Sequence, residues 1–302
     1  ALIGVSIATA LCSGVPLADA VSTVTDGVGK TLGSVIVVVG LGAMLGKMIE
    51  VSGGAEAVAQ YFTTRLGPAK VAGAVTLAAF ILGIPVFFDV GFIILAPIVF
   101  GFAAVSKQNP LKIGLPVAGA LLTVHVTLPP HPGPVAVAGV LDSDVGMMLT
   151  FGLPIAAITA AVGFFAAKLL KVEKIERGKS PVELEDMGPI GVAPSPFLIL
   201  GLILLPIGLI MVGTTGAMLT EEGTTVNTFV SFIGSSPVAL LIAVIAAWFF
   251  IGRQQHWNLE RGSSVMDSAL PAVAVIIFVT GAGGGFANVL VESGIGKVLS
   301  DI

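Results

Sequence analysis

Apolar residues occur along this chain in long uninterrupted runs and do not alternate with polar residues. The runs Ser195–Val212 and Phe229–Ile251 are each close to the ~20 residues that an α-helix needs to cross a bilayer. Strands of a membrane barrel would show segments of about ten residues with alternating polarity. The pattern therefore predicts spanning helices near residues 1–16, 31–49, 71–84, 87–105, 113–129, 147–170, 195–213, 229–252 and 267–291.

Glycine and proline interrupt these predicted helices at two places. Gly83-Ile84-Pro85 separates the third span from the fourth. Four prolines between Leu128 and Pro134 end the fifth span, because proline lacks the amide that a helix requires. The most polar stretch, 171–194, predicts a cytoplasmic linker that joins a first half, 1–170, to a second half, 195–302.

Composition places the chain among membrane proteins. Of 302 residues, 55% are hydrophobic and 11% are charged, and the mean hydropathy is +1.05. Soluble domains carry about 25% charged residues, so a surface this apolar faces lipid. The net charge of −4 predicts no nucleic-acid partner, and the single cysteine, Cys12, cannot form an intrachain disulfide. We predict an all-α polytopic helical bundle, with broken or re-entrant helices and no soluble domain.

Basic residues fall on one side of the predicted spans. If the first span enters from the cytoplasm, all 14 lysines and arginines except Lys30 and Lys297 lie in cytoplasmic segments. Cytoplasmic loops of membrane proteins are enriched in these residues, which supports the predicted span count. The outward loops carry acidic residues, namely Asp19, Asp26, Asp142, Asp144, Glu221 and Glu222.

Two segments of the chain resemble each other and predict an internal repeat. Four positions coincide without a gap: Gly40 with Gly281, Gly42 with Gly283, Ser52 with Ser293 and Gly53 with Gly294. Small residues also recur in unrelated membrane helices, because they allow close packing. The two segments run in opposite directions across the predicted membrane, which is typical of the inverted repeats of secondary transporters. We therefore expect two inverted halves, the second of them incomplete, in a chain truncated at both ends.

The first candidate substrate site is the turn Ser52-Gly53-Gly54, which follows the second predicted span. Where a helix unwinds in a transporter, amides and the positive end of the helix dipole point at a cavity. A serine hydroxyl and exposed amides can hold a carboxylate there, and Ser293-Gly294 would supply a second such turn. The alternative is a simple helix cap, which glycine favours. Glu50 and Glu56 flank the turn; we interpret them as solvated, with a gating role as the alternative.

Asp89 is the candidate for proton coupling. It lies among large apolar residues in GIPVFFDVGF, residues 83–92. A carboxylate in such surroundings is costly and marks a functional site by default. It can bind and release a proton near neutrality. Alternatively, Asp89 caps the span that begins after Pro85.

A third candidate site flanks the proline-rich break. Imidazole groups donate hydrogen bonds to anions or take up protons during transport, so we expect Thr123, His125 and His131 to contact substrate. His125 is also a second candidate for proton coupling. No HEXXH spacing occurs and no Cys or Glu lies nearby, so we predict no metal site. The structural alternative is that the histidines bind loose backbone carbonyls.

At these residues the chain resembles the gluconate permease family of proton symporters, within the ion transporter superfamily. The resemblance spans essentially the whole chain. It rests on GLGAMLGKMIEVSGGAE from Gly40, GIPVFFDVGFIILAPIVF at 83–100, HVTLPPHPGP at 125–134 and GAGGGFANVLVESGIGK at 281–297.

The resemblance implies proton-coupled import of gluconate or a related small sugar acid across a bacterial inner membrane. It also implies two inverted halves that each contain a re-entrant hairpin, and often a homodimer. The hairpin that we expect near 113–134 rests partly on this resemblance and partly on the proline pattern. We expect no cofactor and no catalytic residue.

Alternatives from the same and from other classes stay open. Sodium coupling competes with proton coupling, because backbone carbonyls at broken helices also bind sodium. Relatives in the family transport other small hydroxylated carboxylates or D-serine. A membrane-embedded metal hydrolase built on Asp89, His125 and His131, or a channel or passive scaffold without coupling, would be a protein of another class.

Overall fold

The computed structural model describes residues 1–66, 70–105, 108–172 and 193–294, without the side chains at 34, 66, 89, 90, 93, 94, 97, 101, 104, 105 and 272. Every secondary-structure element in these ranges is a helix, which confirms the predicted all-α membrane fold. The α-helices are α1 (Leu2–Cys12), α2 (Leu17–Val51), α3 (Gly54–Leu66), α4 (Val71–Leu82), α5 (Phe88–Val105), α6 (Leu111–Thr127), α7 (Pro132–Val140), α8 (Val145–Leu169), α9 (Pro196–Leu219), α10 (Thr225–Gly234), α11 (Ser236–Ala247), α12 (Leu259–Asp267) and α13 (Leu270–Glu292), and a π-helical segment, Trp248–Gly252, extends α11.

In the described ranges, the number of helices long enough to cross a membrane is smaller than the number of spans that hydropathy predicts. Four stretches in the described ranges qualify by length and composition: Leu111–Val140, α8, α9 and most of α13. Two bent pairs, the halves of α2 and α10 with α11, bring the number to as many as six. The predicted spans at 1–16 and 71–84 correspond to α1 and α4, which have 11 and 12 residues and are too short to span alone.

The proline-rich segment interrupts the fifth predicted span as the sequence indicates. α6 ends at Thr127, and α7 begins at Pro132, where proline is tolerated because the first amides of a helix have no intrahelical partner. α6 and α7 together form one candidate span, Leu111–Val140. The re-entrant hairpin near 113–134 and the division into inverted halves remain predictions.

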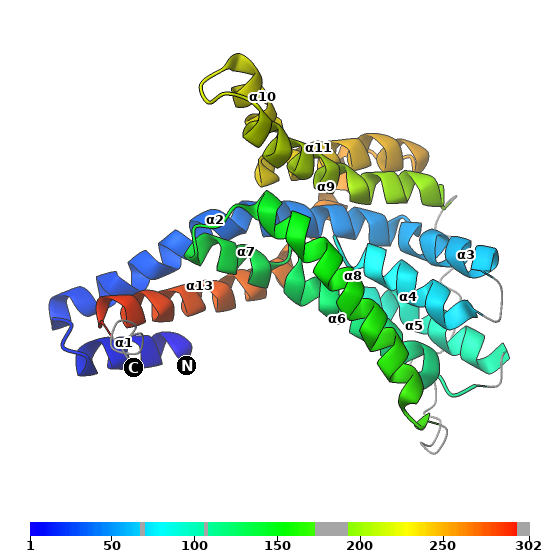
Figure 1. The fold of residues 1–302 in the computed structure, drawn as a ribbon, viewed down its shortest axis with the longest axis horizontal. Helices are drawn as coiled ribbons and strands as arrows, with labels where there is room; N and C mark the ends of the chain where they lie inside the picture. The colour runs from blue at the N-terminus through cyan, green and yellow to red at the C-terminus, as the bar shows by residue number, and fades with distance from the viewer. Residues whose placement is uncertain (67–69, 106–107, 173–192, 295–302) are drawn as a thin grey trace.

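Helix α2 runs along the length of the molecule, and α13 lies beside it in the opposite direction (Figure 1). Glycine permits this close approach. A Cβ on Gly284 would overlap the Thr31 hydroxyl and stand 2.8 Å from the carbonyl oxygen of Gly27. The amide of Asn288 donates to the carbonyl of Thr23 at 2.8 Å and fixes the register of the two helices. Small residues therefore hold the first half of α2 against α13.

The second half of α2 belongs to the main hydrophobic core. Leu45, Met48 and Ile49 are fully buried there, together with apolar residues of α4, α6 and α9. Ala55, Val58 and Ala59 of α3 belong to the same core. α2 therefore connects the packing against α13 with the packing around the helix breaks. This arrangement positions the site described below.

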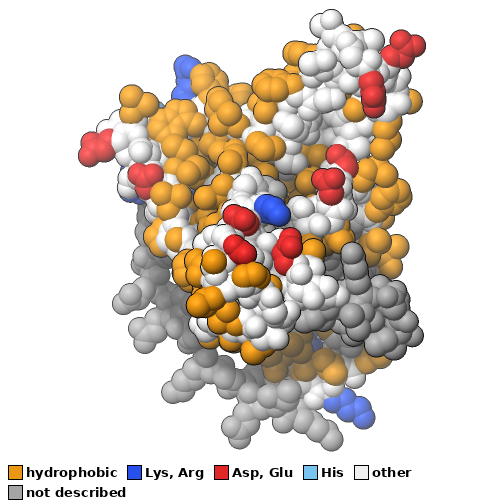
Figure 2. Space-filling model, turned by 90° about the vertical axis from the view of Figure 1, so that its left-hand side faces the viewer, with side chains coloured by type: hydrophobic (Ala, Val, Ile, Leu, Met, Phe, Trp, Pro, Cys, Tyr) orange, Lys and Arg blue, Asp and Glu red, His pale blue; other side chains and the backbone are white. Residues whose placement is uncertain are grey.

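The acidic residues predicted for the outward loops are all exposed, although two of them lie in a helix and not in a loop. Asp19 and Asp26 lie on the exposed face of the first part of α2, and Asp142 and Asp144 precede α8. Figure 2 views the molecule from the end at which α2 begins and shows several acidic side chains among wide hydrophobic areas. The arrangement fits a protein whose apolar sides face lipid and whose charges gather at the ends of its helices.

We expect Gly284→Ala to lower the stability of the protein. The added methyl would overlap Thr31 and force α2 away from α13, and overpacking of this kind costs about 1–3 kcal/mol. The matched control is Gly283→Ala on the same helix, because nothing lies within 4 Å of a Cβ at Gly283. Thermal unfolding in detergent compares the two variants. Equal melting temperatures would contradict the close packing of α2 on α13.

Candidate functional site

Two helix breaks meet inside the molecule and are joined by a hydrogen bond. One break lies at residues 83–87, between α4 and α5, and the other at residues 128–131, between α6 and α7. His131 Nε2 lies 2.7 Å from the carbonyl oxygen of Gly83. Because a carbonyl only accepts, Nε2 must carry the proton and donate it. His131 is 2% exposed, so this bond satisfies a buried carbonyl that the end of α4 leaves without a helical partner.

Both breaks rest on the glycine-rich half of α2. A Cβ on Gly42 would come within 2.9 Å of Pro130 Cγ. A Cβ on Gly46 would come within 2.5 Å of the carbonyl oxygen of Pro85. Larger residues at these two positions would push the breaks away from the helix. Close contact with irregular backbone therefore explains glycine at positions 42 and 46.

The histidines predicted to share a site lie together. The ring centroids of His125 and His131 are 4.5 Å apart, and Phe87 from the other break lies 6.1 and 6.0 Å from them. Thr123 does not join this cluster. Its hydroxyl donates to the carbonyl of Gly119 at 2.7 Å, within α6. Residues two positions apart on a helix are rotated by roughly 200° about its axis, so Thr123 and His125 lie on different faces of α6.

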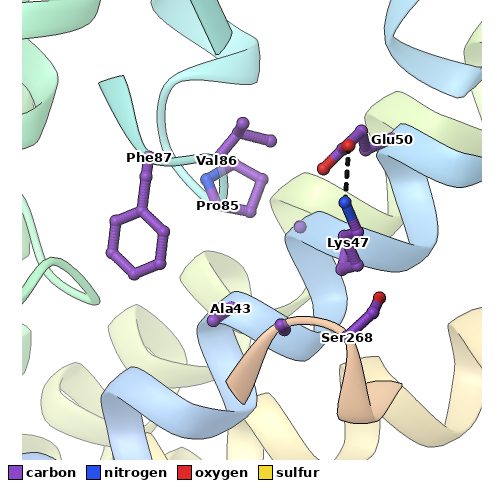
Figure 3. Close-up of a pocket in the computed structure, with 9 residues that line it drawn as sticks. Ala43, Lys47, Glu50, Pro85, Val86, Phe87 and Ser268 are labelled. Carbon is purple, nitrogen blue, oxygen red and sulfur yellow. Dashed lines mark hydrogen bonds and ion pairs between the residues drawn. The ribbon is translucent and has the colours of Figure 1, made fainter. Parts of the chain in front are cut away.

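A small cavity adjoins the first break (Figure 3). It measures about 60 Å³ and lies between α2, the break at 83–87 and the junction of α12 with α13. Lys47 and Glu50 of α2 form its charged side, with Lys47 Nζ 2.7 Å from Glu50 Oε1. Phe87 lines the opposite side, and it also contacts both imidazole rings. The cavity and the histidine pair are therefore neighbours that share Phe87.

Sequence reasoning did not select Lys47, and it interpreted Glu50 as solvated. Both side chains are about one quarter exposed, at 26% and 24%, so they are half-buried in the cavity wall. Their spacing of three residues on an otherwise apolar helix would have indicated an ion pair on one face. Sequence spacing could not show that the break at 83–87 lies opposite this pair.

The Ser52-Gly53-Gly54 turn has the geometry of a packed helix end. Ser52 is fully buried, and its hydroxyl donates to the carbonyl of Ile49 at 2.9 Å. The Ser52 carbonyl accepts from Gln255 Nε2 at 3.3 Å. A Cβ on Gly54 would come within 2.5 Å of Ile199 on α9. The Ser52 hydroxyl thus donates to a carbonyl of its own helix, which agrees with the alternative that the turn is a simple helix cap.

The second copy of the repeat ends in the same turn. Ser293 donates to the carbonyl of Leu290 at 2.9 Å, as Ser52 does to Ile49. The next residue has a positive φ in both copies, 73° at Gly53 and 71° at Gly294. Glycine adopts this conformation without strain, which explains why both copies carry it. The sequence similarity is therefore matched by backbone conformation and by hydrogen bonding.

Asp89 lies in the first turn of α5, directly after the first break. Its side chain is outside the described part of the structure, so its role in proton coupling remains a prediction. Within the described ranges, no three side chains of His, Cys, Asp or Glu come together in a way that could hold a metal ion.

Glu56 lies in the first turn of α3, close to the Gly53 turn. Its Oε2 atom is buried without a hydrogen-bond partner. Burial raises the pKa of this carboxyl group, and repulsion from Glu50 raises it further, whereas a hydrogen bond from its own backbone amide lowers it. Glu56 is therefore a half-buried carboxylate that interacts electrostatically with Glu50 of the charged cavity.

The whole chain, residues 1–302, matches the family model described as GntP family permease. This protein belongs to the GntP family. The inner membrane permease YgbN of Escherichia coli (strain K12) is 48% identical over 317 residues, which cover 100% of this chain and 69% of the relative. A gluconate permease of Pseudomonas aeruginosa is 35% identical, over 97% of this chain and 66% of the relative.

A high-affinity gluconate transporter of Escherichia coli is 33% identical over 100% of this GntP chain and 69% of its own length. The permease thus spans about two thirds of the length of these relatives. No solved structure matches it. Family membership confirms the predicted resemblance and identifies a membrane transporter.

We expect His131→Phe to destabilise this permease. Phenylalanine keeps the ring but removes the N–H, which leaves the buried Gly83 carbonyl unsatisfied at a cost of about 1–3 kcal/mol. His131→Gln keeps an N–H at a similar distance along the side chain and should lose less. Unfolding in detergent measures both. Equal losses would show that the bond to Gly83 does not hold the breaks together.

The stability of the permease should depend on Glu56 in a defined pH range. Because the folded pKa of Glu56 is raised above its ordinary 4.5, the folded state holds the proton more tightly than the unfolded state. The free energy of unfolding therefore falls as pH rises from 4.5 through the folded pKa. Glu56→Gln has no carboxyl group to ionise, so it avoids this fall in the free energy of unfolding. The variant should therefore have a higher melting temperature than the unaltered protein at pH 8 and a similar one at pH 4.

The matched control is Glu260→Gln, because Glu260 is also in the first turn of a helix, α12, but is exposed. This control should change the melting temperature little at either pH. A Glu56→Gln effect of the same size at both pH values would contradict the pKa shift.

Proposed function

We propose that this protein imports gluconate or a related small sugar acid together with a proton across a bacterial inner membrane. Relatives named as gluconate permeases and transporters, and one named as an L-idonate transporter, support a hydroxylated carboxylate as the substrate. The observation that carries the proposal is the Lys47–Glu50 pair in the wall of a cavity beside two helix breaks.

The ion pair gives a physical basis for binding an anion. A cation that is half-buried in a membrane protein is stable only with a partner, and here Glu50 is that partner. A substrate carboxylate can take the place of Glu50 beside the ammonium group of Lys47. The cavity of about 60 Å³ is below the ~300 Å³ of typical ligand pockets, so it suits the carboxylate end of the substrate.

The same exchange provides a reason for proton coupling. When the substrate pairs with Lys47, Glu50 is left as a second carboxylate in a site of low dielectric. A proton on Glu50 then keeps the net charge of the cavity unchanged, so one anion and one proton move together. Asp89 and His125 are the other candidates for this proton, because Asp89 follows the first break and His125 contacts Phe87 at the cavity.

The substrate hydroxyls need polar partners, and the two breaks supply them. Irregular backbone at 83–87 and 128–131 has carbonyls and amides outside regular helix bonding, which is how transporters build substrate sites. His131 contributes by holding the breaks together. Ser52 and Thr123 are weaker candidates than the sequence suggested, because their hydroxyls donate within their own helices. Gly53, Gly54 and the Ser293-Gly294 turn remain proposed contacts.

The test is uptake of labelled gluconate into liposomes that contain the protein, under an inward proton gradient and without sodium. We expect accumulation that a protonophore abolishes. Glu50→Gln should abolish accumulation but retain exchange of gluconate across the membrane, because the variant keeps binding and loses the proton site. Lys47→Gln should weaken both activities by at least tenfold, because it removes the cation.

Lys30→Gln, on the other half of α2, is the control that removes the same charge away from the cavity. Uptake that requires sodium would overturn proton coupling. Accumulation that survives in Glu50→Gln but is lost in Asp89→Asn would move the coupling site to Asp89. Transport of D-serine but of no sugar acid would overturn the substrate.

A further inference from the structure

A second surface, which shares no lining residue with the charged cavity, joins a basic groove to an apolar one. The basic groove measures about 720 Å³ and lies where α4 and α6 begin and α8 ends. Three lysines line it, Lys70, Lys112 and Lys168, together with Phe164 and Phe165. None of the described residues in its lining is acidic. The groove therefore presents positive charge next to aromatic rings.

The apolar groove continues from the basic one between α4 and α8. It measures about 310 Å³ and shares Gly73, Phe164 and Phe165 with the basic groove. Its remaining lining is alanine, leucine, phenylalanine and one threonine. A Cβ on Gly73 would make an ordinary van der Waals contact with Phe164, at 3.6 Å. A ligand that fits both grooves needs an anionic end and a hydrocarbon chain.

Lys168 lies at the junction of the two grooves. Its ammonium nitrogen is 4.2 Å from the ring centroid of Phe164 and 5.4 Å from that of Phe165. These rings hold the charge where the polar groove meets the apolar one. The neighbouring residues Leu169 and Leu170 are 82% and 55% exposed, which is expected of a surface in contact with lipid.

The position of the grooves matches the headgroup layer of a bilayer. α8 is a candidate membrane span, and Lys168 is in its last turn. Lysines at the end of a span direct their charge toward the lipid phosphates. By the distribution of basic residues along the chain, this end belongs to the cytoplasmic leaflet, which carries anionic lipids.

We propose that the two grooves bind an anionic phospholipid, with its phosphate at Lys70, Lys112 and Lys168 and one acyl chain between α4 and α8. A zwitterionic lipid would match the apolar groove but would bring no net negative charge to the basic groove. A soluble phosphate ester would match the lysines but would leave the apolar groove unfilled. The site is independent of the proposed transport activity.

The first test compares phosphatidylglycerol with phosphatidylcholine. Purified protein in detergent is titrated with each lipid, and bound lipid is counted by native mass spectrometry. We expect phosphatidylglycerol to bind more tightly. Each lysine near an anionic headgroup contributes about fivefold in affinity, so Lys70→Gln with Lys168→Gln should weaken phosphatidylglycerol binding by about thirtyfold and change phosphatidylcholine binding little.

Lys30→Gln is again the matched control, because it removes one exposed lysine at a site outside both grooves. It should leave phosphatidylglycerol binding unchanged. Equal binding of the two lipids by the unaltered protein, or equal weakening of both lipids in the lysine variants, would overturn the proposal. Equal weakening would mean that the lysines support the fold and do not recognise a headgroup.

The second test separates a lipid from a soluble phosphate. Ala161→Phe places a ring in the apolar groove at an exposed position, so the fold should tolerate it. We expect this variant to lose phosphatidylglycerol although all three lysines remain. Glycerol 3-phosphate should fail to compete with the lipid at equal concentration. Full competition, or unchanged lipid binding in Ala161→Phe, would show that the acyl groove is not part of the site.

Discussion

A helix that breaks inside a membrane protein leaves backbone carbonyls and amides without partners, and each costs several kilocalories per mole in hydrocarbon. Here a residue of one break supplies the hydrogen-bond partner that a carbonyl of the other break lacks. The imidazole of His131 donates to the carbonyl of Gly83, and both breaks lie on the glycines of α2. The position of Phe87, and therefore the wall of the charged cavity, depends on this contact. The structural role predicted as the alternative for His131 is thus the one that the hydrogen bond supports.

Sequence patterns predicted the helical class and the two breaks, because long apolar runs and the prolines at 129, 130, 132 and 134 act locally. Within the described residues, the same patterns predicted more spans than helix length and composition support. Hydropathy measures whether a segment is apolar, and α4 is as apolar as a spanning helix although it has only 12 residues. Length and burial in the core are decided by contacts with other helices, which no local window contains.

The candidate site was predictable in part for the same reason. His125 and His131 lie near each other in sequence, and the break between them brings their rings together. Thr123 lies on a different face of α6 from His125, because residues two positions apart on a helix are rotated by roughly 200°, and its contact with substrate remains a prediction. The Lys47–Glu50 pair was missed, since its relation to Pro85 and Phe87 depends on how α2 packs against a segment about forty residues away.

The paired turns at Ser52 and Ser293 have different surroundings although their local geometry is the same. Ser52 is fully buried, whereas Ser293 is half-buried. An inverted repeat whose halves were equivalent would give both turns similar packing. Alternating access in such transporters requires that two similar halves take up different environments and then exchange them. The inverted repeat remains a prediction, and the difference in burial between the two serines is what one state of such a cycle would show.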